Sequence, residues 1–217
     1  MAVKNALLWI VKALGTLSLL TGIIVLILVL TASTISNNIN ERSLQDRLID
    51  NIVENHYEEA SALVQNETGY TPGKEALRVY LTANKDQLGE PPVDIPREKL
   101  IKGFTTLGII LTVVGLLLIL LGSTFHIFNM LFFIGLAALI GGIVSGAILF
   151  VIKAVLPKLI TQMAQGNPNL PALFVTVVQE VFNDIFLRPI SNGILMSAVI
   201  GGIGLLLVVS VKIVEKK

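Results

Sequence analysis

Four long apolar runs constrain this chain more than any other feature of its sequence. They cover about residues 7–32, 104–121, 130–152 and 190–211. Each run has about 18 residues or more, which is enough for a helix to cross a hydrocarbon core of about 30 Å. Lipid offers no partner to unpaired backbone groups, so segments of this length must cross it as helices. Charged residues make up only 14% of the chain, against roughly a quarter in soluble proteins. We therefore predict an all-α integral membrane protein with four transmembrane helices.

The four runs divide the chain into five predicted segments. These are the first transmembrane helix (1–33), an exposed segment (34–102), the second and third transmembrane helices (103–153), a second exposed segment (154–189), and the fourth transmembrane helix with its tail (190–217). The first run is longer than the apolar core of about 7 to 15 residues found in a secretory signal peptide. We expect it to be an uncleaved signal anchor, and a cleaved signal peptide is the competing interpretation.

Charge beside the spans suggests an orientation in the cell membrane. With four spans, both termini lie on one side, and that side carries Lys4, Lys12, Lys212, Lys216 and Lys217. The first exposed segment lies opposite and holds twelve of the fifteen acidic residues but eight of the sixteen basic ones. Because lysine and arginine favour the cytoplasmic face, we predict a multi-pass protein with both termini in the cytoplasm. The two exposed segments are then extracytoplasmic.

The first exposed segment has the pattern of two amphipathic helices. In the first helix, one apolar stripe runs through His56 without a break. Its members are Leu44, Leu48, Ile52, His56, Ala60 and Leu63, and it is widened by Ile49, Val53, Tyr57 and Val64. For the second helix we predict an N-cap at Thr71, Pro72 in the first turn, and an end at Gly89. Two helices of this size bury too little surface to fold alone. They need another surface to pack against.

The second exposed segment supplies a candidate for that surface. Between Pro171 and Pro189, apolar residues recur on one helical face, and polar residues such as Glu180 occupy the other. We predict a discrete helix that begins at Pro171 and ends before Pro189, preceded by a shorter amphipathic piece after Ile152. Its candidate interaction residues are Phe174, Val178, Phe182 and Phe186.

Two interpretations of this helix compete. Its apolar face lies in the membrane interface, or it docks against the apolar stripes of the first exposed segment. Interfacial helices are usually rich in lysine and arginine, whereas this polar face has Glu180, Asp184 and only Arg188 as a base. Docking is therefore favoured. It would build a small extracytoplasmic helical cap from both exposed segments.

Small residues recur at regular intervals within three of the spans. The candidate packing residues are Gly108, Gly115, Gly122, Ala138, Gly142, Gly146, Gly193, Ser197 and Gly201. Such rows let helix backbones approach closely and predict a four-helix bundle. No Asp, Glu, Lys, Arg or His lies near the centre of a span. Because intramembrane charges mark ion and proton paths, their absence argues against a proton-coupled transporter.

The exposed segments contain little that suggests chemistry. His56 and Glu59 are three residues apart, a spacing that binds metals only when other helices add ligands. The chain has no cysteine, which excludes disulfides and thiolate metal sites. Asn66 begins an Asn-Glu-Thr triplet that fits the glycosylation pattern. We predict no catalytic, cofactor-binding or metal-binding residue, no cofactor and no nucleic-acid partner.

These observations favour a non-enzymatic four-span membrane protein. The leading hypothesis is an accessory or assembly subunit that contacts membrane lipid and binds a partner protein, or forms a homo-oligomer, through its extracytoplasmic amphipathic helices. The alternative is a carrier of lipid or of another small hydrophobic molecule, in which the 171–188 helix covers a cleft. An enzyme comes third, because it would need a site around His56.

Overall fold

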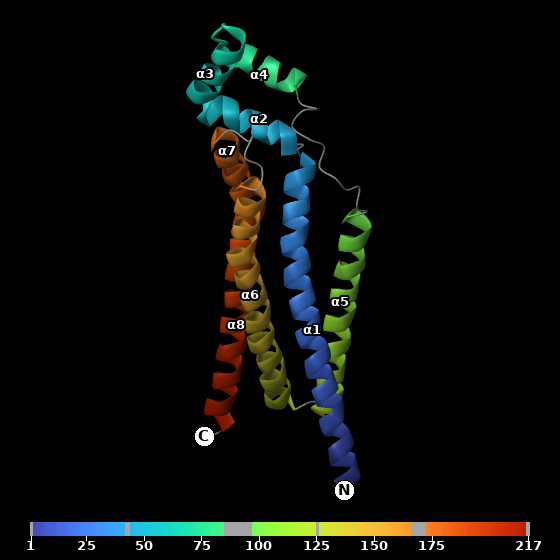
Figure 1. The fold of residues 1–217 in the computed structure, drawn as a ribbon. Coiled ribbons are helices and arrows are strands. Elements are labelled where there is room, and N and C mark those ends of the chain that lie inside the picture. Colours follow the sequence, from blue (N-terminus) through green and yellow to red (C-terminus); the bar gives the residue numbers. More distant parts are fainter. Residues whose placement is uncertain (1, 42–43, 85–96, 125, 166–171, 216–217) are drawn as a thin grey trace. The chain divides into compact units, whose positions relative to one another are not determined.

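The computed structural model describes residues 2–41, 44–84, 97–124, 126–165 and 172–215. All regular structure in these ranges is helical, as predicted (Figure 1). Four helices are long and apolar enough to cross a membrane, which confirms the predicted number of spans. The chain forms two compact units. Unit 1 comprises Met1–Thr34, Pro96–Lys153 and Ile190–Lys217, and unit 2 comprises Ile35–Ile95 and Ala154–Pro189.

Unit 1 consists of the four apolar helices. They are α1 (Ala2–Glu41), α5 (Arg97–Gly122), α6 (Ile127–Gln165) and α8 (Arg188–Glu215). The C-terminal ends of α1 and α6 and the first residues of α8 belong to unit 2. Within unit 1, the start of α1 and the end of α8 lie at the same end (Figure 1). Large apolar side chains such as Leu117, Phe150 and Leu206 are more than half exposed. This surface suits lipid, which accepts apolar side chains that water does not.

Helices α1 and α5 approach each other along glycines seven residues apart. A methyl group built on Gly115 would lie 2.5 Å from the backbone nitrogen of Leu19, and one on Gly22 would lie 2.7 Å from that of Thr112. Methyl groups on Gly108 and Gly122 would also meet α1, at 3.0 Å from a Leu26 side-chain carbon and 2.9 Å from the Lys12 backbone nitrogen. The two backbones are therefore in direct contact.

A second close contact joins α6 and α8. A methyl group on Gly142 would lie 2.5 Å from the carbonyl oxygen of Ser197 and 2.6 Å from the backbone nitrogen of Gly201, and one on Gly146 would lie 3.3 Å from the Ser197 Cβ. The hydroxyl oxygens of Ser145 and Ser197 are 3.1 Å apart and fully buried. The Ser197 hydroxyl donates to the Gly193 carbonyl, and the Ser145 hydroxyl donates either to the Gly141 carbonyl or to the Ser197 oxygen. Both polar groups are thus satisfied without water.

Helix α1 also contacts the other helices of unit 1. Leu19, Ile119 and Ala137 form a buried apolar cluster that joins α1, α5 and α6. The Lys12 ammonium lies 5.5 Å from the centroid of the Phe133 ring, a cation–π distance. A methyl group on Gly193 of α8 would collide with the Thr31 side chain. The remaining predicted packing residue, Ala138, is buried.

Unit 2 is built from two segments that are far apart in the sequence. Its helices are the end of α1, α2 (Leu44–Asn55), α3 (Tyr57–Thr68), α4 (Lys74–Ala83), the end of α6, α7 (Ala172–Phe182) and the π-helical turn η2 (Asn183–Leu187). Among the described residues, one apolar core joins the end of α1, α2, α3, α4, α7 and η2. Its buried members are Leu48, Ile49, Ile52, Val53, Ala60, Val64, Leu77, Val177, Val181 and Ile185. The predicted docking of the 171–188 face against the first exposed segment is therefore present within this unit.

Helix boundaries in the first exposed segment differ from the prediction. The expected continuous helix breaks at His56, whose backbone angles are φ −125° and ψ 25°. The break turns α3, so that Val64 of the predicted stripe is buried as expected, whereas Leu63 is exposed. Packing against Leu77 of α4 thus outweighs the local periodicity.

Helix α4 begins two residues later than the predicted first turn. Gly73 occupies the N-cap position, and Pro72 lies before the helix. The Pro72 carbonyl accepts hydrogen bonds from the Tyr57 hydroxyl at 2.9 Å and the Ser61 hydroxyl at 3.4 Å. These bonds to α3 hold the preceding segment outside the helix. The predicted end at Gly89 lies outside the described residues.

The predicted helix end before Pro189 is wrong, and the amphipathic piece expected after Ile152 is a continuation of the third span and not a separate helix. Helix α6 continues through Pro157 to Gln165, and α7 continues through η2 into α8, which contains Pro189. Proline has no N–H and its ring crowds the preceding turn, which normally ends a helix. Here the turn before Pro189 is π-helical, with the Arg188 N–H bonded to the Asn183 carbonyl five residues earlier. The wider turn lets the chain stay helical past the proline.

Candidate functional site

The predicted interaction residues of α7 and η2 lie mostly on the inner side of unit 2. Val178 and Phe186 pack against the core of the unit. The Phe182 ring stacks on that of Phe186, with centroids 4.3 Å apart and planes 19° apart. Phe182 also lines a cleft of about 230 Å³ beside Pro157. The Phe174 side chain lies outside what the structure describes. The described members of this set therefore hold the unit together from within.

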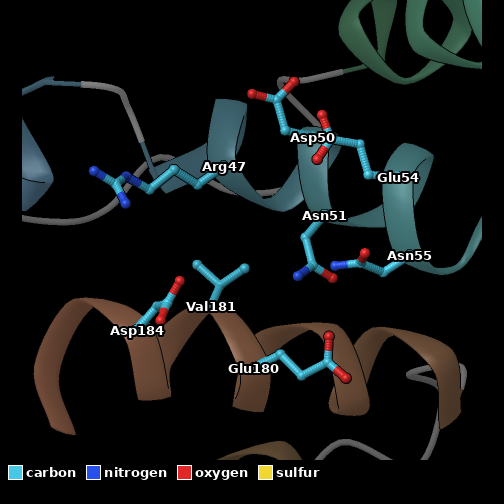
Figure 2. A pocket seen from close by; sticks show the side chains of 8 residues that line it. All are labelled: Arg47, Asp50, Asn51, Glu54, Asn55, Glu180, Val181 and Asp184. Carbon is cyan, nitrogen blue, oxygen red and sulfur yellow. The ribbon is translucent and has the colours of Figure 1, made fainter. Parts of the chain in front are cut away.

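A polar groove runs between α2 and the α7–η2 segment (Figure 2). Its volume is about 410 Å³. Residues from α2 face residues from α7 and η2 across it. The lining residues are Arg47, Asp50, Asn51, Glu54, Asn55, Glu180, Val181 and Asp184.

Acidic side chains dominate this polar groove. Four carboxylates and one guanidinium, that of Arg47, line it. The Asp50 carboxylate is paired with Arg78 of α4 at 3.0 Å, and the Asp184 carboxylate lies 3.8 Å from Arg188 in the next turn. The Arg47 Nε and the Asn51 Oδ1 are buried and have no hydrogen-bond partner among the described residues. The groove is thus acidic and only partly neutralised from within unit 2.

His56 connects the two segments of unit 2 at the end of this groove. Its Nε2 lies 3.1 Å from the Glu180 Oε2 of α7. The sequence singled out Glu59 as the neighbour of His56, but the observed partner is 124 residues away and had no local signal. Among the described residues, no group of three or more His, Asp or Glu could hold a metal ion. The contact is therefore a structural link within unit 2.

A second groove, lined mainly by apolar atoms, lies between α3 and α4. Its volume is about 550 Å³, and we call it the α3–α4 groove. The lining residues are Val64, Thr68, Tyr70, Pro72, Glu75, Ala76, Val79 and Tyr80. Tyr70 is 64% exposed and Val79 is 67% exposed. No sequence pattern marks this groove, because Tyr70 and Val79, its two most exposed members, belong to no apolar stripe.

Three hydroxyl groups of α3 and α4 are engaged in structural hydrogen bonds. The Tyr57 and Ser61 hydroxyls both donate to the Pro72 carbonyl. The Tyr80 hydroxyl donates to the Glu67 carboxylate at 3.5 Å. A nucleophilic hydroxyl needs a hydrogen-bonded base that is itself oriented by a third group. These three hydroxyls do not have that arrangement.

Comparison with protein-family models, with curated proteins and with solved structures found no match.

Proposed function

We propose that this chain is a non-enzymatic accessory or assembly subunit, held in the membrane by four spans, that binds a partner protein through unit 2. One observation carries the proposal. Two segments separated by the second and third spans pack into one apolar core, yet the unit still presents two open grooves of about 410 and 550 Å³. Specific protein interfaces need such a fixed, partly apolar surface with a polar surround.

The chemistry of unit 2 favours binding over catalysis. Its acidic groove and its apolar groove differ in character, as expected for surfaces that contact different parts of one partner. Its candidate nucleophiles serve as donors to the Pro72 carbonyl. Its one histidine is paired with Glu180. These contacts stabilise the unit and leave no free acid–base pair among the residues named.

The carrier hypothesis requires α7 to move as a lid, and the packing of α7 argues against that movement. Val177 and Ile185 are completely buried, and Val181 is 6% exposed. Lifting the helix would expose these side chains together with Leu48 and Ile52, which share their core. Full exposure of each aliphatic side chain costs about 1.5–3 kcal/mol. A lid that opens readily is normally held by fewer contacts.

We place unit 2 outside the cytoplasm, with both termini inside. Lys4, Lys12 and Lys212 lie toward one end of the unit 1 helices and support this orientation. Lys99, Lys102 and Lys153 lie toward the other end of these helices and favour the opposite orientation. The acidic excess of residues 34–102 weighs less, since acidic residues contribute little to orientation.

Native mass spectrometry of the protein extracted from its own membrane tests the proposed function. We expect a protein partner in a fixed stoichiometry, retained at low detergent. Charge reversal of the polar groove, Glu54→Lys with Asp184→Lys, should reduce that partner at least about fivefold, because rim charges steer association. The matched control is Glu98→Lys, an exposed carboxylate that lies in unit 1. A monomer with one tightly held lipid and no protein would contradict the proposal and favour the carrier.

A further inference from the structure

The α3–α4 groove has the features of a binding surface for one kind of partner segment. The buried Val64 and Pro72 line it, together with the exposed Ala76, Tyr70 and Val79. In the described part of unit 2, Tyr70 and Val79 are the most exposed large apolar side chains. Large apolar side chains that gather in one exposed place mark interaction sites more often than isolated ones do.

The wall of the groove between α3 and α4 is held in place. The left-handed Gly69, with φ 73°, ends α3, and its N–H bonds to the Gln65 carbonyl at 2.8 Å. The Thr68 hydroxyl accepts the Tyr70 N–H at 3.3 Å. Pro72 is buried and its carbonyl is bonded to α3. Because the connection is tied at both ends, the groove exists before anything binds, which lowers the cost of ordering.

The charged side chains at this groove are of one sign. Helix α4 carries Lys74, Glu75 and Arg78, but both bases are directed to other parts of unit 2: the Lys74 ammonium lies 5.6 Å from the Tyr57 ring centroid, and Arg78 pairs with Asp50. Glu75 alone of the three lines the groove. A second carboxylate, Glu67, is hydrogen-bonded to the hydroxyl of the lining residue Tyr80. The described charges at the groove are thus negative.

From this combination we infer that the α3–α4 groove binds a segment of a partner protein that presents aliphatic side chains beside a lysine or arginine. The aliphatic side chains cover the apolar side chains of the groove, and the cation meets Glu75 and the ring faces of Tyr70 and Tyr80, which attract cations. The inference rests on the proposed function, since it assigns the partner's chemistry to one surface of unit 2. Anionic lipid headgroups do not fit, because the same carboxylates repel them.

Fluorine NMR offers a direct test, because the chain has only three tyrosines. Tyr70 and Tyr80 line the groove and Tyr57 does not, so 3-fluorotyrosine labelling gives two reporters and one internal control. The full-length protein in nanodiscs is titrated with two capped tripeptides of sequence Leu-Lys-Leu and Leu-Glu-Leu. We expect saturable shifts of the Tyr70 and Tyr80 signals with the lysine peptide. The glutamate peptide should bind about tenfold more weakly, because its charge repels the same carboxylates.

Single substitutions assign the binding to the groove. Glu75→Gln should weaken the lysine peptide about two- to fivefold, the usual effect of losing one exposed ion pair. Glu58→Gln is the matched control, because Glu58 is exposed on α3 and does not line this groove. Val79→Ala removes an exposed apolar contact without touching the core, so weaker binding there reflects the groove and not unfolding.

Four outcomes would overturn the inference. The first two are equal binding of both peptides and signal shifts at Tyr57 as large as those at Tyr70 and Tyr80. The third is a set of shifts that follows the lipid composition of the nanodisc and not the peptide. The fourth is a set of groove shifts that depends on protein concentration alone, which would assign the groove to a second copy of this chain. Failure of this inference can be distinguished from failure of the proposed function. A partner retained in native mass spectrometry beside a groove that binds neither peptide would remove only this assignment.

Discussion

Leu77→Ala is expected to destabilise unit 2 by about 2–5 kcal/mol, because truncating a fully buried leucine removes its apolar contacts and leaves a cavity. Leu77 has no exposed surface and lies in the core that joins α2, α3, α4 and α7. Hydrogen exchange of the full-length protein in nanodiscs measures the effect on each helix separately. The exchange of α2 and α7 amides should accelerate together with that of α4, because the three helices share one core.

Val79→Ala provides the control on the same helix. Val79 is 67% exposed, so its truncation should change stability by less than about 0.5 kcal/mol. Ile185→Ala tests the same core from the other segment, since Ile185 is completely buried and lies in η2. It should accelerate exchange in α2, more than 100 residues away in the sequence. Faster exchange confined to the 172–187 segment would contradict the shared core.

Gly204→Ala is expected to separate α6 from α8. The added methyl group would lie 2.6 Å from the Gly135 carbonyl oxygen and 2.9 Å from the Ala138 carbonyl carbon, and it would collide with the backbone nitrogen of Leu139. Backbone atoms cannot move aside as the end of a side chain can. Overpacking of this kind costs about 1–3 kcal/mol.

Gly202→Ala is the matched control, two residues away in α8. A methyl group there would meet nothing within 4 Å. Both substitutions replace glycine by alanine within one helix and gain a similar helix propensity, so their difference isolates the clash. Unfolding of the purified protein in mixed micelles measures it, and Gly204→Ala should be less stable than Gly202→Ala by about 1–3 kcal/mol. Equal stabilities would show that the close contact at Gly204 is absent.

The four spans could be predicted from the sequence because lipid removes most alternatives. A long apolar run in a membrane protein must be helical, so hydropathy alone identified the spans. The α7 face could be predicted for a related reason, since the period of its apolar residues places Val177, Val181 and Ile185 together, and all three are buried. Both inferences used short-range patterns whose meaning does not depend on the rest of the chain.

Contacts between residues that are far apart in the sequence were not predicted. The glycines Gly15 and Gly22 have the same seven-residue spacing as Gly108 and Gly115, and comparing the two rows would have found the α1–α5 contact. No local pattern marks the Glu180 partner of His56. The π-turn before Pro189 was also unpredictable, because a proline after an amphipathic helix usually signals its end. The α3–α4 groove is lined by residues of two helices and of the connection between them, so no single helical stripe marks it.

The position of unit 2 outside the cytoplasm is the claim on which the partner's location depends, and cysteine labelling tests it most directly. The chain has no cysteine, so each introduced thiol is the only one. Gly73→Cys places a thiol in unit 2 where a side chain meets nothing within 4 Å, and Glu215→Cys places one at the exposed end of α8. A membrane-impermeant maleimide should label Gly73→Cys in intact cells and Glu215→Cys only after lysis. The reverse pattern would place unit 2 in the cytoplasm, and labelling of both in intact cells would contradict the four-span topology.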